Sequence, residues 1–252
     1  MQNLGFTLGL STLVPEAVLL WRARQGQLLT RFPFFYSYLA YVLCGSAMIF
    51  FVYEVLPSSY PSAYRFYFVV SIVVEFAVLI EISDHIFQPF PAIRNLGRGL
   101  TILISVTFAL VYILPAILQP RGSSPALLDF ALRASVTKAV ILAVLLFTTS
   151  HFGLKLGRNV AGLMLGFSIF LGMDVANLAL AQSFGRALYA RIFWVMSPIA
   201  YTVCLLVWTV ALWEYAPLPR TGSMPLADGG DSESLALELA RFNTMLSRFL
   251  NK

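Results

Sequence analysis

The 252-residue chain is 59% hydrophobic and only 12% charged, whereas about a quarter of the residues in a soluble domain are charged. Its formal net charge of +5 comes from basic residues spread through short polar breaks and a tail, so no nucleic-acid partner is expected. The composition excludes a soluble globular domain and indicates a membrane protein.

Seven long apolar stretches set the predicted architecture. A hydrocarbon core about 30 Å thick needs roughly 20 apolar residues in a helix. The stretches cover residues 6–20, 34–53, 66–86, 100–118, 131–150, 160–181 and 192–213. We therefore expect an all-α polytopic membrane protein, with a seven-helix transmembrane domain over residues 1–215 and no extramembrane catalytic domain.

The basic residues predict the orientation. The connections on one side of the membrane carry Arg22, Arg24, Arg31, Arg94, Arg98, Lys155 and Arg158, and the tail on that side adds Arg220, Arg241, Arg248 and Lys252. The opposite side carries Arg65, Arg121, Arg133, Arg186 and Arg191. The positive-inside bias then predicts an outside N-terminus and a cytoplasmic C-terminus.

The C-terminal part has a different composition. Residues 216–231 are rich in Pro, Gly and Asp, which is typical of a flexible linker. Residues 232–252 predict a cytoplasmic amphipathic helix, whose apolar positions recur at spacings of four and three: Leu235, Leu239, Phe242, Leu246 and Phe249. We call these five residues the tail seam. Two heptads are marginal alone, so the tail seam is expected to meet a second copy, another protein or the membrane face.

Two local patterns predict packing. Gly162 and Gly166 in the sixth stretch are spaced as a small-xxx-small pair, which favours close helix contact inside the bundle over homodimerisation. Asp129 and Arg133, one helical turn apart before the fifth stretch, are expected to pair.

Ionisable side chains inside hydrocarbon are costly and are functional candidates. Lys138 and Asp174 are predicted at similar depth in the fifth and sixth stretches, and we expect them to form an ion pair. Asn177, one turn from Asp174, is expected to extend this polar cluster. Glu75 is expected to stand alone at mid-membrane, either as a proton relay or as a protonated acid bonded to a neighbouring helix. Glu16 lies in the first stretch.

Further polar residues gather at the inner end of the third stretch. Glu81 and His85 are one turn apart, so that carboxylate and imidazole are expected to meet, with Asp84 beside them. His151 ends the fifth stretch on the same side. Two histidines on different helices leave open axial haem ligation or a metal site, although no cofactor is predicted. The sequence carries no catalytic motif, so no catalytic residue and no enzyme are expected.

The segment 79–98, Leu-Ile-Glu-Ile-Ser-Asp-His-Ile-Phe-Gln-Pro-Phe-Pro-Ala-Ile-Arg-Asn-Leu-Gly-Arg, resembles a stretch in an uncharacterised family of seven-span bacterial inner-membrane proteins. There, a Glu and a His one turn apart end the third span before a basic loop. The layout is more distantly similar to the seven-helix sensor region of bacterial histidine kinases. The resemblance implies a multi-pass protein of the bacterial inner membrane. The 252 residues contain no phospho-acceptor domain and no ATP-binding domain of a kinase. The resemblance to the sensor region therefore also implies that any signal passes to a separate partner.

Three functions follow as hypotheses. The first is a non-enzymatic membrane sensor, scaffold or anchor that engages a partner through the C-terminal helix. The second is a transporter or channel for a small solute or protons that uses Glu75, Asp174 and Lys138. The third is a haem or metal-binding subunit that uses His85 and His151.

Overall fold

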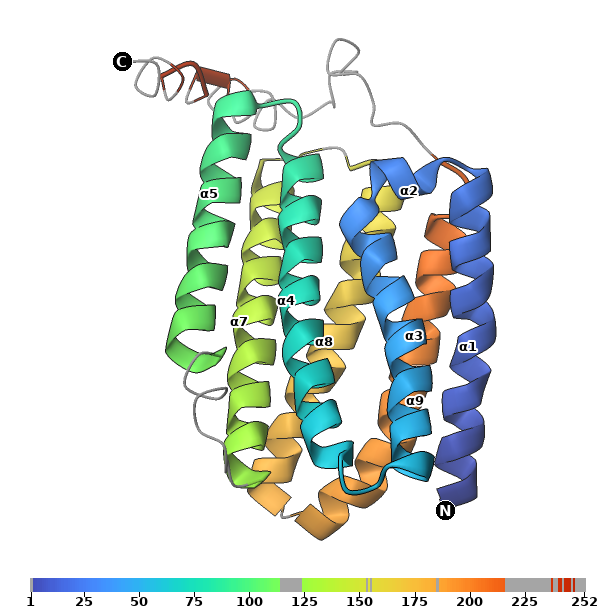
Figure 1. Ribbon diagram of the computed structural model, residues 1–252. Helices are drawn as coiled ribbons and strands as arrows, with labels where there is room; N and C mark the ends of the chain where they lie inside the picture. The colour runs from blue at the N-terminus through green and yellow to red at the C-terminus, as the bar shows by residue number, and fades with distance from the viewer. Residues whose placement is uncertain are drawn as a thin grey trace.

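The computed structural model describes residues 2–113, 124–152, 154, 156–184, 186–215, 237, 240, 241, 243–245 and 247. Its regular elements over these residues are helices, as predicted (Figure 1). The first half contains α1 (Gln2–Gln25), α2 (Leu28–Arg31), α3 (Pro33–Val55), α4 (Tyr60–Ile86), α5 (Pro91–Phe108) and a short π-helix, η1 (Ala109–Ile113). The second half contains α7 (Ser124–His151), α8 (Arg158–Phe184) and α9 (Arg186–Ala211).

Six long helices form a closed ring. In order of contact the ring is α1, α3, α4, α7, α8 and α9, and α9 packs back against α1. Helix α4 also contacts α8 across the ring. Helix α5 lies outside the ring and packs against α4, at the edge of the bundle in Figure 1.

Five helices within the described residues are long and apolar enough to cross a membrane. They are Pro33–Val55, Tyr60–Ile86, Pro91–Tyr112, Asp129–His151 and Arg158–Leu180. This confirms the all-helical class, and the apolar helices are compatible with a multi-pass membrane protein. Several helices begin before the apolar stretch that predicted them: α4 begins at Tyr60 rather than at 66, and α5 begins at Pro91 rather than at 100. Hydropathy marks only the apolar part of a helix. Both helices start earlier, with a proline at the first or second position and a more polar first turn, where proline is well tolerated.

Small residues set the closest helix contacts. Gly166 on α8 lies directly against the indole of Trp208 on α9, and Gly162 lies against Ala211. A β-carbon at either glycine would overlap its neighbour. The predicted packing role of this pair is therefore confirmed. The Trp208 side chain is fully buried and also meets Phe35 of α3 edge-on, with ring centroids 5.1 Å apart.

The tail is described only in part. Residues 237, 240, 241, 243–245 and 247 are helical, in agreement with a C-terminal helix. The predicted linker 216–231 and all five residues of the tail seam lie outside the described residues.

Candidate functional site

A buried ion pair joins two helices of the ring. Lys138 Nζ on α7 donates to Glu75 Oε2 on α4. The two residues are only 3% and 7% exposed. The expected pairing of Lys138 with Asp174 was therefore wrong, and Glu75 does not stand alone. The depth of each group along its helix follows from its position in the apolar stretch, but the direction in which α7 turns its lysine does not.

Asp174 meets the same helix one turn away. Ser135 Oγ on α7 donates to Asp174 Oδ2 on α8. Carboxylates from α4 and α8 thus both face α7, one taking a lysine and the other a hydroxyl. Asn177, which we expected to extend the cluster, is buried on α8 one turn beyond Asp174. We call Glu75, Lys138, Ser135 and Asp174 the interior polar cluster.

A second buried carboxyl lies in the same ring. Glu16 on α1 is 1% exposed and lies beside Tyr201 of α9. Glu16 Oε2 and the Tyr201 hydroxyl are both buried without a hydrogen bond of full geometry, although the carboxyl and the hydroxyl lie close enough to interact. Burying a polar atom without a partner is costly, so this pair is a candidate for function.

Glu81 closes the start of α3. Its carboxylate accepts hydrogen bonds from the backbone N–H groups of Phe34, at 3.0 Å, and Phe35, at 2.8 Å. Helix α3 begins with Pro33, and the residue before it, Phe32, has no side chain that can cap the free N–H groups. A carboxylate 46 residues away in sequence therefore supplies the hydrogen bonds that every helix start lacks.

The expected contact between the Glu81 carboxylate and the His85 imidazole does not form. His85 Nδ1 instead bonds the backbone carbonyl of Glu81 at 2.8 Å, and its ring stacks on Phe32 at 4.6 Å. Since a carbonyl oxygen only accepts hydrogen bonds, Nδ1 must carry the proton of the imidazole. Nε2 of the neutral ring is then an acceptor. The carboxylate is withdrawn because the start of α3 binds it.

Asp84 is held by two arginines of α5. Arg94 and Arg98 reach its Oδ2 at 3.4 and 3.8 Å. These are loose contacts at the edge of hydrogen-bond distance. They tie the end of α4 to the first turns of α5.

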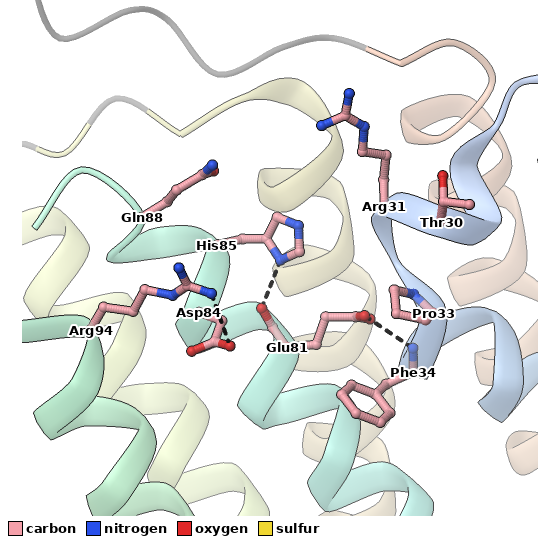
Figure 2. Close-up of a pocket in the computed structure, with 9 residues that line it drawn as sticks. All are labelled: Thr30, Arg31, Pro33, Phe34, Glu81, Asp84, His85, Gln88 and Arg94. Carbon is pink, nitrogen blue, oxygen red and sulfur yellow. Dashed lines mark hydrogen bonds and ion pairs between the residues drawn. The ribbon is translucent and has the colours of Figure 1, made fainter. Parts of the chain in front are cut away.

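These groups surround a pocket with a volume of about 260 Å³. It opens between α2, the start of α3, the end of α4 and the start of α5, as Figure 2 shows. The polar side chains that line it are Thr30, Arg31, Glu81, Asp84, His85, Gln88 and Arg94. We call this space the helix-end pocket.

The two histidines have separate surroundings. His151 stacks on Phe147 at 5.5 Å and meets Phe152 edge-on at 5.0 Å, whereas His85 stacks on Phe32. Within the described ranges, no three His, Cys, Asp or Glu side chains are grouped to hold a metal ion. The haem or metal hypothesis stays a prediction, and an absorption spectrum of the purified protein tests it.

The C-terminal helix contacts the bundle at α5. Asn243 Oδ1 accepts hydrogen bonds from the backbone N–H groups of Ala92, at 2.9 Å, and Ile93, at 3.3 Å. In Figure 1 the helical part of the tail lies over this end of α5. Asn243 therefore caps α5 in the way that an N-cap residue would.

Comparison with known proteins identifies no relative: no family model, no curated protein and no solved structure matches the chain.

Sequence reasoning missed several residues of these sites, and Ser135 and Asn243 are the two that bond across elements. Ser135 was overlooked because serines are common in membrane helices and usually bond their own helix backbone. Asn243 was overlooked because the tail helix was predicted from its apolar spacing alone, which says nothing about its polar side chains. The one available signal was position: Asn243 lies four residues after Leu239 and three before Leu246, so it flanks the seam on the same helix face.

Proposed function

We propose that the chain is a non-enzymatic, seven-span sensor or scaffold of the bacterial inner membrane that engages a protein partner through its C-terminal helix. The observation that carries the proposal is the bond of Asn243 to the first turn of α5. A tail that served only as a tether would need no specific contact with the bundle. A tail docked by one amide on a helix end can be released by a small movement of that helix.

Helix α5 is suited to such a movement. It lies outside the ring and packs against α4. Only 11% of the most apolar part of the span Pro91–Tyr112 is buried, compared with 28–44% in the other four candidate spans. Elements with few buried contacts are those that move at low cost. Its first turn also carries Arg94, which pairs with Asp84 beside the helix-end pocket. The first turn of α5 thus contacts both the helix-end pocket, through Arg94, and the tail, through Ala92 and Ile93.

The seven-span topology rests on helix length and charge. Helices α1 and α9 contain 24 and 26 residues, enough to cross a 30 Å core, and they add two spans to the five candidates. The helix-end pocket and the tail lie at one end of the bundle (Figure 1). Arg22, Arg31 and Arg94 belong to the same end, and the positive-inside bias makes it cytoplasmic.

Truncation of the tail tests the partner role. The full chain and a variant that ends at Arg220 are purified from native membranes after mild cross-linking. The proposal expects a partner protein, or a second copy of the chain, to be recovered only with the full chain. Equal recovery with both forms, or a monomer alone in both, contradicts it. Insertion of both forms is checked by size-exclusion chromatography.

The interior polar cluster supports a second candidate function, transport of protons or a small cation. Ionisable groups buried among membrane helices commonly mark ion pathways, and Glu16 adds another acid in the ring. Flux into vesicles that contain a pH-sensitive dye tests this function. Glu75→Gln and Asp174→Asn should each reduce the flux, whereas the exposed Glu54→Gln should not. No proton or cation flux with the natural chain removes the candidate.

A further inference from the structure

The helix-end pocket has an excess of hydrogen-bond donors over acceptors. Figure 2 shows Arg31, His85 and Gln88 around its upper rim, with Glu81 and Asp84 deeper between the helices. Two arginines and two carboxylates line the space, so the formal charges balance. The hydrogen bonds do not balance, because both oxygens of Glu81 and Oδ2 of Asp84 already have partners, while Asp84 Oδ1 is buried without one.

Each carboxylate already has partners within the protein. Glu81 accepts from the backbone N–H groups of Phe34 and Phe35. Asp84 Oδ2 is shared between Arg94 and Arg98, and Arg98 does not line the pocket. The positive end of the α3 dipole lies at the pocket wall, where Pro33 and Phe34 are lining residues. Glu81 already binds this end of α3, so the groups left to attract an anion are the guanidinium groups of Arg31 and Arg94.

Several donors have capacity left. Among the described residues no carboxylate pairs with Arg31, whose guanidinium lies over the ring of Tyr215 at 5.0 Å from its centroid. Arg94 meets Asp84 only at 3.4 Å, and its side chain is 41% exposed. His85 Nδ1–H is already engaged, and Nε2 of the neutral ring is an acceptor. The Thr30 hydroxyl donates to Gln27 O, so the donors that remain at the pocket are the two guanidinium groups and the Gln88 amide.

We propose that the helix-end pocket binds the phosphate group of a small phosphate ester, which is either a lipid headgroup or a soluble metabolite. Guanidinium groups match the oxygens of a phosphate with paired N–H donors, and here two come from different elements, α2 and α5. A volume of about 260 Å³ lies just below the roughly 300–1,000 Å³ of sites for drug-sized ligands, so it suits a headgroup rather than a large cofactor. The pocket lies where α4 ends and α3 and α5 begin, which is the depth of lipid phosphates in a bilayer.

The competing ligand classes fit less well. A metal ion needs a group of acidic or imidazole ligands, and the described residues contain no group of three. An organic cation needs an accessible carboxylate oxygen or an open aromatic face. Both oxygens of Glu81 and Oδ2 of Asp84 have partners, Asp84 Oδ1 has none but is buried, and Phe32 is covered by His85. This binding site does not depend on whether the C-terminal helix engages a partner, so the two proposals fail separately.

Two arms of one experiment distinguish the sources of phosphate. In the first, glycerol 3-phosphate is titrated calorimetrically into delipidated full-length protein in a nonionic detergent. In the second, the same protein receives phosphatidylglycerol or the phosphate-free diglucosyl diacylglycerol, and native mass spectrometry counts the retained lipid. Binding in the first arm identifies a soluble ester. Retention of phosphatidylglycerol alone, with no binding of glycerol 3-phosphate, identifies a headgroup.

Matched arginine variants complete the test. Arg31→Gln should weaken the observed binding at least tenfold, and Arg31→Lys should weaken it less because the charge remains and only the paired donors are lost. Arg24→Gln removes an exposed arginine at the same end of the bundle that does not line the pocket, and should change binding less than twofold. No binding of either phosphate probe to the natural chain overturns the proposal. Equal effects of Arg31→Gln and Arg24→Gln overturn it as well. A monodisperse elution profile and an unchanged circular dichroism spectrum verify that Arg31→Gln folds, and Arg31→Lys gives the second measure.

Discussion

Lys138 on α7 donates to Glu75 on α4, and the structure buries both side chains inside the helix ring. Two opposite charges removed from water lose hydration that their attraction only partly restores. Removal of one partner alone should therefore lower the free energy of unfolding much more than replacement of both partners by apolar residues. The pair also fixes which faces of α4 and α7 meet, because no other rotation of either helix brings the two groups together.

The first prediction concerns this dependence. Lys138→Met leaves a buried carboxylate without its cation, and should lower the free energy of unfolding by about 3–5 kcal/mol. Glu75→Met should cost a similar amount. The double variant should recover much of the loss, since two apolar side chains need no hydration. Unfolding in a mixed-micelle SDS titration measures all three, and additive losses would contradict a coupled pair.

The second prediction concerns the hydroxyl that serves Asp174. Ser135→Ala leaves the half-buried carboxylate with one donor fewer and should cost about 1 kcal/mol. Ser168→Ala on α8 is a matched control, since the Ser168 hydroxyl bonds only the carbonyl of Met164 on its own helix. Its removal should cost less than about 0.5 kcal/mol, as is usual for changes away from such features. Similar losses for the two variants in the SDS titration would show that the contact with Asp174 is not important.

The third prediction concerns the cap on α3. Glu81→Gln removes the charge and replaces one acceptor oxygen with an amide nitrogen, so one of the two backbone N–H groups loses its partner. The expected cost is about 1–2 kcal/mol, the range for loss of a helix cap. Amide hydrogen exchange should accelerate at Phe34 and Phe35, while Glu54→Gln at the other end of α3 should leave both amides unchanged. Unchanged exchange in Glu81→Gln would show that the carboxylate does not hold the helix start.

Sequence reasoning found the residues of the sites better than it found their partners. Glu75, Lys138 and Asp174 stood out because charge is rare in apolar stretches, and depth followed from counting 1.5 Å per residue. The pairing was wrong because it depends on the rotation of each helix about its axis, which the apolar stretches do not reveal when every face is hydrophobic. One pair within a helix was predicted correctly, since Arg133 Nε lies 2.8 Å from Asp129 Oδ2, whereas the expected contact of the Glu81 carboxylate with His85 does not form.

The ends of the helices show the same limit. Glu81 and His85 lie one turn apart on α4, as predicted. The Glu81 carboxylate, however, binds backbone N–H groups of α3, and no sequence pattern marks such groups as partners. Asn243 likewise binds backbone amides of α5. Any residue type offers such amides, so contacts of this kind emerge only from the three-dimensional arrangement. The glycine pair was predictable because a missing side chain has only one packing consequence.

The fourth prediction tests that close contact. Gly166→Val places two methyl groups where the indole of Trp208 lies, and overpacking of this kind should cost about 1–3 kcal/mol. Gly172→Val on the same helix provides the control, because a β-carbon there meets no atom within 4 Å. Thermal unfolding in detergent, followed through tryptophan fluorescence, compares the two variants. An equal effect at both glycines would indicate that helix propensity, and not the contact with Trp208, determines the loss.

The fifth prediction concerns release of the tail from α5. Asn243→Ala removes the oxygen that accepts from Ala92 and Ile93, so both amides should exchange hydrogen faster. The C-terminal helix should also become more sensitive to limited proteolysis at Arg241. Thr244→Ala changes the neighbouring side chain, whose hydroxyl bonds only Ala240 in the tail itself, and should alter neither property.

The size of the effect separates docking from fraying. A cap contributes about 0.5–2 kcal/mol, and 1.4 kcal/mol corresponds to a tenfold change in an equilibrium. If Asn243 is the main attachment of the tail, Asn243→Ala should raise the rate of proteolysis by about twofold to thirtyfold while the unfolding of the bundle stays unchanged. Faster exchange at Ala92 and Ile93 without faster proteolysis would mean that other contacts hold the tail, and that movement of α5 alone does not release it.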